Sequence, residues 1–203
     1  LGVMALIVVI AVMSGFGKDL RDKILGTNSH IVVTNITRSG IEDFEFILNK
    51  VMRSDGIKAA APFILNHVML TFGNKSSGVV VRGVDPKREA MVSDLEKNMI
   101  QGDISMLKAE EKGGAGLIHD NIILGKELSH KLGVKAGDAV SMVSPASRLT
   151  PMGLIPKIKL FKVVGFFESG MFEYDSSLAF ISVKSAQKFF AMKGKVSGIE
   201  IRV

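Results

Sequence analysis

The pattern of apolar and polar positions separates one long apolar block from a region of short alternating elements. Residues 1–13 (LGVMALIVVIAVM) carry no charged side chain. A helix of this length spans about 20 Å at 1.5 Å per residue, which is less than the roughly 30 Å hydrocarbon layer of a bilayer. The block therefore needs an explanation other than a complete membrane span.

Three interpretations of the block remain open. A signal-peptide core has this length, but residues 15–18 (GFGK) do not resemble a small-residue cleavage site. A buried core helix is possible, although β-branched residues occupy every face. We favour the outer half of a membrane helix, because Phe16, Leu20 and Ile24 continue the apolar pattern at helical spacing and Gly26 is a typical helix stop. Residues 1–26 are then the end of a transmembrane helix that becomes a stalk, whose basic residues leave its orientation undecided.

After the stalk the pattern alternates between strand and helix, which predicts an α+β fold. Ser39 and Glu42 have the spacing of a capping box, so we expect a helix to begin directly after Ser39. The apolar helical stripe lies between a first strand and a hairpin of two long strands. The expected elements of this unit are residues 30–34, 41–52, 57–72 and 77–84.

A similar β-α-β unit closes the chain. Residues 178–183 form a strand, Ser182 caps the following helix, and Gly194 ends it. In residues 196–203 the alternation predicts a strand in which Ile199, Ile201 and Val203 face one way and Glu200 and Arg202 the other. We expect the two units to pair in one split β-α-β, ferredoxin-like sheet.

The expected domain organisation places an insertion between these units. This middle part contains a Lys/Glu- and Gly-rich connector at residues 108–116 and a strand-helix unit at residues 121–132. The predicted divisions are the helix end and stalk at 1–26, a porter-like β-α-β subdomain at 27–86 plus 176–203, and an inserted β-rich (Sabre-like) subdomain at 87–175.

The composition gives no reason to propose chemistry. Cysteine is absent, which excludes disulfides and thiol catalysis. The net charge is +6, but one Tyr, no Trp and no long basic run argue against nucleic-acid binding. No Walker A motif is present, the four His residues lack metal-ligand spacing, and His119 with Asp120 is best interpreted as a turn pair. We expect no catalytic residue, no cofactor and no metal, and therefore no enzyme.

The strongest local signal is the segment 140–160. Pro145, Pro151 and Pro156 disfavour continuous helix or central strand there, yet the segment is apolar for a loop. No acidic residue occurs between 139 and 167, whereas Arg148, Lys157, Lys159 and Lys162 are basic. An ordinary hairpin that folds back onto the domain is one interpretation. We favour a stiff projecting hairpin that docks a partner, through Arg148, Leu149, Thr150, Pro151, Met152, Gly153, Leu154, Ile155 and Pro156.

The whole chain, and not the hairpin segment alone, resembles a known family. It is similar to the first periplasmic domain of the LolC/LolE family of lipoprotein-releasing ABC transporter permeases, a MacB-like periplasmic core. The LolC side carries an S-A-S-x-x-T-P-M-G-x-I-P hairpin, which residues 146–156 match while Pro145 replaces the first Ser. The other matching stretches are residues 2–26, 79–86 (VVVRGVDP), 123–138 (ILGKELSHKLGVKAGD) and 169–177 (SGMFEYDSS).

This resemblance implies a function in lipoprotein transport. A hook around Thr150, Pro151, Met152 and Gly153 would bind a soluble periplasmic lipoprotein carrier (LolA-like). ATP hydrolysis would belong to a cytoplasmic ATPase subunit (LolD-like), and the lipoprotein cargo would be taken from the bacterial inner membrane, with this domain in the periplasm. The second permease subunit is either LolE-like or another copy of this chain.

Two other functions are compatible with the sequence. A macrolide-exporter-like efflux permease shares the β-α-β halves and the stretch 123–138, but it lacks the Pro-Met-Gly hairpin. A membrane-tethered sensor of a small ligand is the alternative from another class. The number of apolar spans beyond this sequence distinguishes a permease from a receptor.

Overall fold

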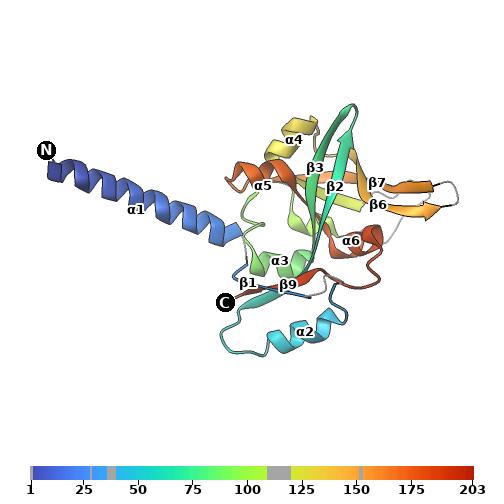
Figure 1. Ribbon diagram of the computed structural model, residues 1–203, viewed down its shortest axis with the longest axis horizontal. Helices are drawn as coiled ribbons and strands as arrows, with labels where there is room; N and C mark the ends of the chain where they lie inside the picture. The colour runs from blue at the N-terminus through green and yellow to red at the C-terminus, as the bar shows by residue number, and fades with distance from the viewer. Residues whose placement is uncertain (1, 28, 36–39, 109–119, 151–152) are drawn as a thin grey trace.

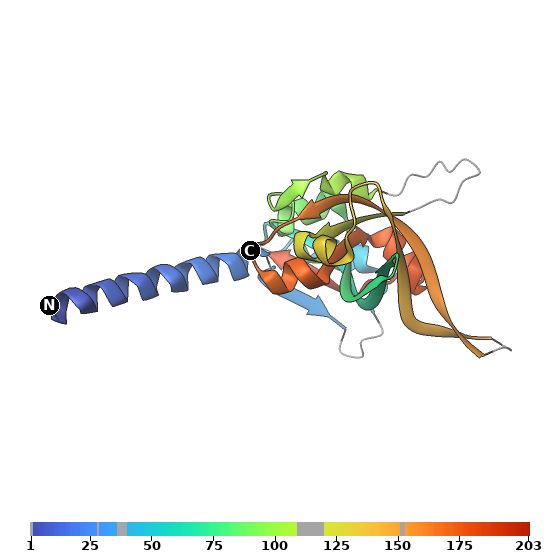
Figure 2. The same cartoon turned by 90° about the horizontal axis from the view of Figure 1, so that it is seen from above.

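The computed structural model describes residues 2–27, 29–35, 40–108, 120–150 and 153–203, and of these it describes the side chains of all but 19–27 and 145–155. Helix α1 (Gly2–Thr27) is continuous and extends away from the folded body (Figures 1 and 2). Its large apolar side chains between Val3 and Phe16 are exposed. Within the described ranges, no helix combines the length and the apolarity needed to cross a membrane. The origin of residues 1–26 in a membrane helix stays a prediction.

The strands of the described residues join in one nine-stranded sheet, with the order β1-β9-β2-β3-β8-β5-β7-β4 and with β6 against β2 and β7. The strands are β1 (Ile31–Thr34), β2 (Ala59–Phe72), β3 (Lys75–Val84), β4 (Met99–Gln101), β5 (Asp120–Gly125), β6 (Ala139–Thr150), β7 (Gly153–Phe167), β8 (Leu178–Ser182) and β9 (Gly198–Arg202). The helices after α1 are α2 (Phe44–Val51), α3 (Pro86–Val92), η1 (Ile104–Leu107), α4 (Lys126–Leu132), α5 (Phe172–Ser177) and α6 (Val183–Phe190).

The first unit folds as expected except at the start of its helix. Strands β2 and β3 form the predicted hairpin, closed by the pair Phe72 and Lys75. Helix α2 begins only at Phe44, while Ser39 of the predicted capping box lies outside the described residues. Ile41 does not join the helix, because its N–H and carbonyl bond to the backbone of Val196 at 2.7 and 3.1 Å. The bridge across the sheet outweighs the local capping signal.

The second unit is confirmed with one change. The Ser182 hydroxyl accepts a hydrogen bond from the Ser185 N–H at 3.1 Å, which is the predicted cap of α6. The helix ends at Phe190, earlier than the predicted stop at Gly194. Ala191 adopts the left-handed conformation with φ 55° and takes the role expected of the glycine.

The α+β class is confirmed, and strands from both ends of the chain meet in the same sheet. Strand β3 pairs in parallel with β8, and β9 lies between β1 and β2. Strands β5, β7 and β4 from residues 87–175 continue this sheet. The ferredoxin-like description and the three-part division of the chain stay predictions.

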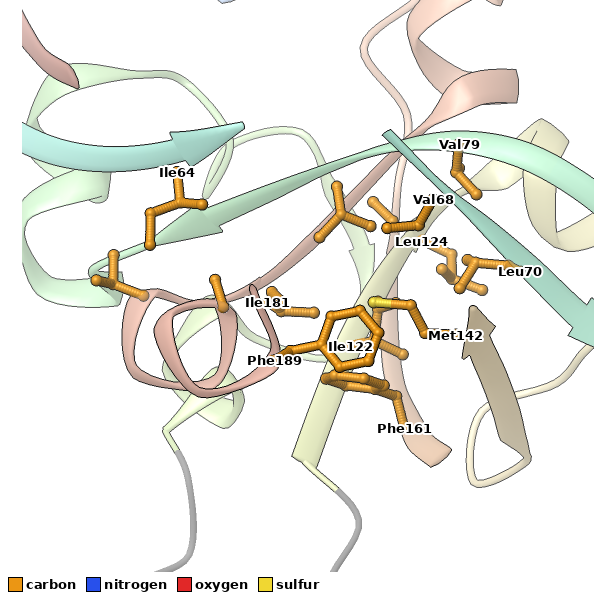
Figure 3. Close-up of a cluster of buried hydrophobic side chains, with 14 of the residues drawn as sticks. Ile64, Val68, Leu70, Val79, Ile122, Leu124, Met142, Phe161, Ile181 and Phe189 are labelled. Atoms are coloured by element: carbon orange, nitrogen blue, oxygen red, sulfur yellow. The ribbon is translucent and has the colours of Figure 1, made fainter. Parts of the chain in front are cut away.

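The main core lies on one face of the sheet, under α2, α4 and α6 (Figure 3). Phe161 of β7 and Phe189 of α6 meet edge to face, with ring centroids 6.1 Å apart. Full burial of one such side chain stabilises the fold by about 1.5–3 kcal/mol. Other fully buried members are Ile64, Leu70, Ile122, Leu124, Met142 and Ile181. A second apolar cluster covers the other face, with Val84, Leu95, Ile104, Leu107, Ile123, Phe167 and Phe180.

Strand β9 shows the predicted alternation, but its polar face is buried. Ile199 and Ile201 join the main core. Glu200 is also buried and forms an ion pair with Arg82 of β3, which lies 3.3 Å from Glu89 of α3. Burial raises the pKa of Glu200, although the Arg82 charge opposes this effect. The Arg82 guanidinium therefore forms ion pairs with two carboxylates, at the junction of β3, β9 and α3.

This cluster predicts a dependence of stability on pH. Because the folded-state pKa of Glu200 is raised, its contribution to stability is complete at acidic pH and is lost as the pH rises through that value. The Glu200→Gln variant cannot titrate there. We expect its free energy of unfolding, relative to the unsubstituted chain, to increase between pH 4 and pH 8 in urea denaturation.

The matched control is Glu96→Gln, which removes an exposed carboxylate. The free energy of unfolding of this control should differ from that of the unsubstituted chain by a nearly constant amount over the same pH range. A constant difference for Glu200→Gln as well would contradict the raised pKa.

Candidate docking hairpin

The segment singled out by its prolines forms a long antiparallel hairpin of β6 and β7. The two strands pair from Ala139 opposite Lys162 to Thr150 opposite Gly153. Only residues 151–152, which lie outside the described part, connect the strands. The expected reversal is therefore placed just before Gly153.

Pro145 marks a change in how β6 is paired. Residues 141–143 pair with β2 on one side and with β7 on the other, so the expectation that no central strand occurs in this segment is wrong there. The register of β6 against β7 shifts between Ser144 and Ser147. A proline lacks the N–H that a central strand donates, so it is compatible with a bulge or an edge. Beyond Ser144, β6 pairs with β7 alone.

The backbone of the hairpin projects from the body. Both views show β6 and β7 reaching outward on the side opposite to α1 (Figures 1 and 2). The register places Arg148 opposite Ile155 and Leu149 opposite Leu154. Pro156 pairs with Ser147 and is exposed.

The structure describes the other predicted docking residues only in part. Thr150 and Gly153 close the paired region, and Pro151 and Met152 lie outside the described residues. The side chains of Arg148 to Ile155 are likewise outside the described part of the chain. Their docking role stays a prediction, which the projecting backbone accommodates.

Two of the four basic residues in this segment are fixed to the body. The Lys157 ammonium donates a 2.8 Å hydrogen bond to the Lys188 carbonyl oxygen and lies 5.3 Å from the centroid of the Phe189 ring. Lys159 forms an ion pair with Asp120. These lysines anchor the base of the hairpin, whereas Lys162 is exposed. The positive charge expected for the projecting hairpin is therefore partly used at its base, by Lys157 and Lys159.

A row of apolar side chains at the base was missed by the sequence analysis. Met69 of β2 pairs with Val143 of β6, which pairs with Ile158 of β7. Met69 and Ile158 are 49% and 60% exposed. The buried neighbours Val140 and Met142 show that the opposite face is the one against the core. Alternation within β6 could have predicted an outward Val143, but only the register shows its neighbours.

The titratable side chains near the hairpin base are the groups there that could hold a metal ion. Among the described residues, no group of three or more His, Asp or Glu side chains is arranged to hold a metal ion. Asp120 is engaged by Lys159, and its sequence neighbour His119 lies outside the described residues. What the hairpin offers is shape, apolar surface and anchored strands, which suit protein recognition.

Comparisons with known proteins agree with the family expected from the sequence. Residues 1–203 match the family described as MacB-like periplasmic core domain. The chain is 35% identical, over its full length and 46% of the relative, to the lipoprotein-releasing system transmembrane protein LolC of Xylella fastidiosa. It is 32% identical to the LolC protein of Neisseria meningitidis serogroup B, over its full length and 47% of that relative. The chain thus spans about half the length of these relatives, and the resemblance to LolC/LolE is confirmed.

The fold has a counterpart among solved structures. It resembles the crystal structure of the extracellular domain of the noncanonic ABC-type transporter YknZ from Gram-positive bacteria, with a TM-score of 0.55. The sequences are 12% identical, and the match covers 81% of this chain and 74% of the other. At this identity the similarity concerns the fold alone.

The anchoring of the hairpin base can be tested through Lys157. In Lys157→Met the aliphatic stem remains, while the bond to the Lys188 carbonyl and the charge over the Phe189 ring are lost. We expect the free energy of unfolding to fall by about 1 kcal/mol in urea denaturation. Lys162→Met, an exposed position on the same strand, should change it by less than about 0.5 kcal/mol. Equal effects of the two substitutions would show that Lys157 does not anchor the hairpin.

Proposed function

The chain belongs to the family of MacB-like periplasmic core domains, and we propose that it is the periplasmic domain of an ABC transporter permease in the inner membrane. The permease releases lipoproteins from that membrane and passes them to a soluble periplasmic carrier, which docks on the β6–β7 hairpin. The observation that carries this proposal is the projecting hairpin, whose connection contains the Pro151-Met152 pair. The relatives named lipoprotein-releasing system transmembrane protein LolC support it.

The position of the hairpin relative to α1 fits a carrier that approaches from the periplasm. Helix α1 has 26 residues and is about 39 Å long at 1.5 Å per residue. Its exposed apolar half points away from the body, and the hairpin points in the opposite direction (Figure 2). If the apolar half lies in the membrane, the hairpin reaches into the periplasm.

The anchored base supports recognition by a pre-organised hairpin. Residues 141–143 are paired on both sides, and Lys157 and Lys159 are fixed to the body. Binding then orders few groups that were free before, so little conformational entropy is lost. The row of the exposed Met69 and Ile158 with the half-buried Val143 between them adds apolar surface next to the hairpin, available to the same carrier.

The other parts of the proposed transporter lie outside this chain. A cytoplasmic ATPase subunit hydrolyses ATP, as the similarity to the lipoprotein-releasing LolC proteins implies. A second permease subunit, either LolE-like or a copy of this chain, completes the membrane part. The lipoprotein is cargo, and the chain itself acts as a binding and transmitting domain without catalysis.

An efflux permease is the nearest alternative, because family membership and fold are compatible with both functions. The Thr-Pro-Met-Gly sequence at the hairpin connection favours lipoprotein transfer, since it resembles the LolC pattern. A direct binding experiment at this connection distinguishes the two.

The test combines Pro151→Ala with Met152→Asp. The first change loosens the connection, and the second places a charge where an apolar contact is proposed, so capture of the soluble carrier should weaken at least about 100-fold. The measurement is surface-immobilised binding of the purified carrier to the full chain, with circular dichroism as the check of folding.

The control is Phe46→Asp, which places the same charge at a 72% exposed apolar residue of α2. It should bind the carrier like the unsubstituted chain. Unchanged capture by the hairpin variant, in a folded protein, would remove the role proposed for the hairpin. A chain that binds no carrier in any form would instead favour the efflux permease.

A further inference from the structure

A groove away from the hairpin contact has no role in the proposed function. It lies where α2, α3 and α6 begin, in the half of the body where Figure 1 shows these helices near β2 and β9. Its volume is about 880 Å³. Phe44, Pro62 and Val183 give it an apolar floor, and Phe44 is only partly buried. This volume lies in the upper range of binding pockets, well above what a single phosphate or carboxylate requires.

Each of the three carboxylates around the groove lies beside a basic side chain, and two of them share the same one. Glu45 accepts two hydrogen bonds from the Arg88 guanidinium, at 2.9 and 3.0 Å. Asp85 lies 3.8 Å from the same guanidinium, and Asp120 pairs with Lys159. The bond with Glu45 raises the pKa of Arg88, so this pairing persists over the physiological pH range. Arg88 and Lys159 together supply two positive charges against these three carboxylates, so one negative charge is left for the other basic side chains of the groove.

Three of the lysines that line the groove differ from Arg88 and Lys159 in having no such carboxylate partner among the described residues. Lys87 of α3, Lys108 after η1 and Lys188 of α6 are exposed and line the groove. Within the part of the chain that the structure describes, none of these three forms a salt bridge with a side-chain carboxylate. The groove therefore presents surplus positive charge from three separate elements above an apolar floor.

We propose that this groove binds an acidic peptide segment of a partner protein. Its carboxylates meet Lys87, Lys108 and Lys188, and an apolar side chain of the segment occupies the floor beside Phe44 and Val183. Charges that come from three elements match carboxylates spaced along a chain better than the clustered charge of one phosphate group. An apolar floor adds the desolvated contact that gives a peptide affinity beyond charge attraction.

The groove shares helix α6 with the docking hairpin but uses a different part of it. The Lys188 side chain lines the groove, while the Lys188 carbonyl oxygen accepts the hydrogen bond from Lys157 at the hairpin base. The proposed peptide contacts lie in the groove and not at the hairpin connection, so this inference does not depend on the proposed function. The hairpin variant tests binding of the carrier, and a separate groove variant tests binding of the peptide, so the two losses can be told apart.

The probe is a fluorescein-labelled decapeptide in which Glu alternates with Phe and Leu, titrated with the full chain and followed by fluorescence anisotropy. A peptide with Gln in place of Glu reports the contribution of the carboxylates. The double variant Lys87→Glu with Lys188→Glu turns two attractions into repulsions, so binding of the Glu peptide should weaken about tenfold. Added salt should weaken binding to the unsubstituted chain.

The matched control is Lys131→Glu with Lys135→Glu. It changes the net charge equally at exposed positions on and after α4, away from the groove. The proposal requires this control to bind the Glu peptide nearly like the unsubstituted chain. Equal weakening by the two double variants would reduce the effect to net charge and overturn the proposal, as would equal binding of the Glu and Gln peptides.

Vesicles containing phosphatidylglycerol provide the last arm, with phosphatidylcholine vesicles as the neutral reference. If the groove variant loses binding to the anionic vesicles while peptide binding is unchanged, the groove is a lipid-facing surface and the peptide proposal is wrong. If the groove variant loses the peptide alone, the proposal is supported.

Discussion

The pairing of β6 determines the form of the projecting hairpin. Up to Ser144 the strand is held between β2 and β7, and beyond Pro145 it has β7 as its only partner. A two-stranded ribbon without further support is marginally stable in water. Here its first residues are built into the sheet of the body, and Lys157 bonds it to the end of α6. The hairpin can therefore project without its base losing order.

Helix α6 links the core, the hairpin and the groove because its successive residues face different surroundings. Phe189 packs edge to face on Phe161 in the core, and the carbonyl of Lys188 anchors the hairpin. The Lys188 side chain lies in the groove. A short amphipathic helix over the sheet thus organises two surfaces that are far apart in the sequence.

Much of the architecture could be predicted from local patterns, and the errors have physical causes. The β2–β3 hairpin and the Ser182 cap were predicted correctly, because turn residues and side-chain caps act within a few positions. The start of α2 was not, since Ile41 is held by a bridge to Val196, 155 positions later in the numbering. The burial of Glu200 was also missed, because alternation predicts the two faces of a strand but not what covers them. The hairpin was found through its prolines, whereas the groove depends on three helices meeting and left no pattern in the sequence.

Strand β2 gives the body a direct connection between the end near α1 and the base of the hairpin. Its first residues, from Ala59 to Phe63, pair with β9, which in turn pairs with β1 directly after the helix. Its last residues, from Met69 to Thr71, pair with β6. At about 3.3 Å per residue the 14 residues of this strand span roughly 46 Å. A strand resists extension because its covalent backbone is already nearly straight, and the buried Arg82 and Glu200 pair ties β3 and β9 on either side of it. The sheet therefore connects the region next to α1 with the base of the hairpin through one continuous strand, so the two ends of the body are mechanically joined even though α1 and the hairpin do not touch.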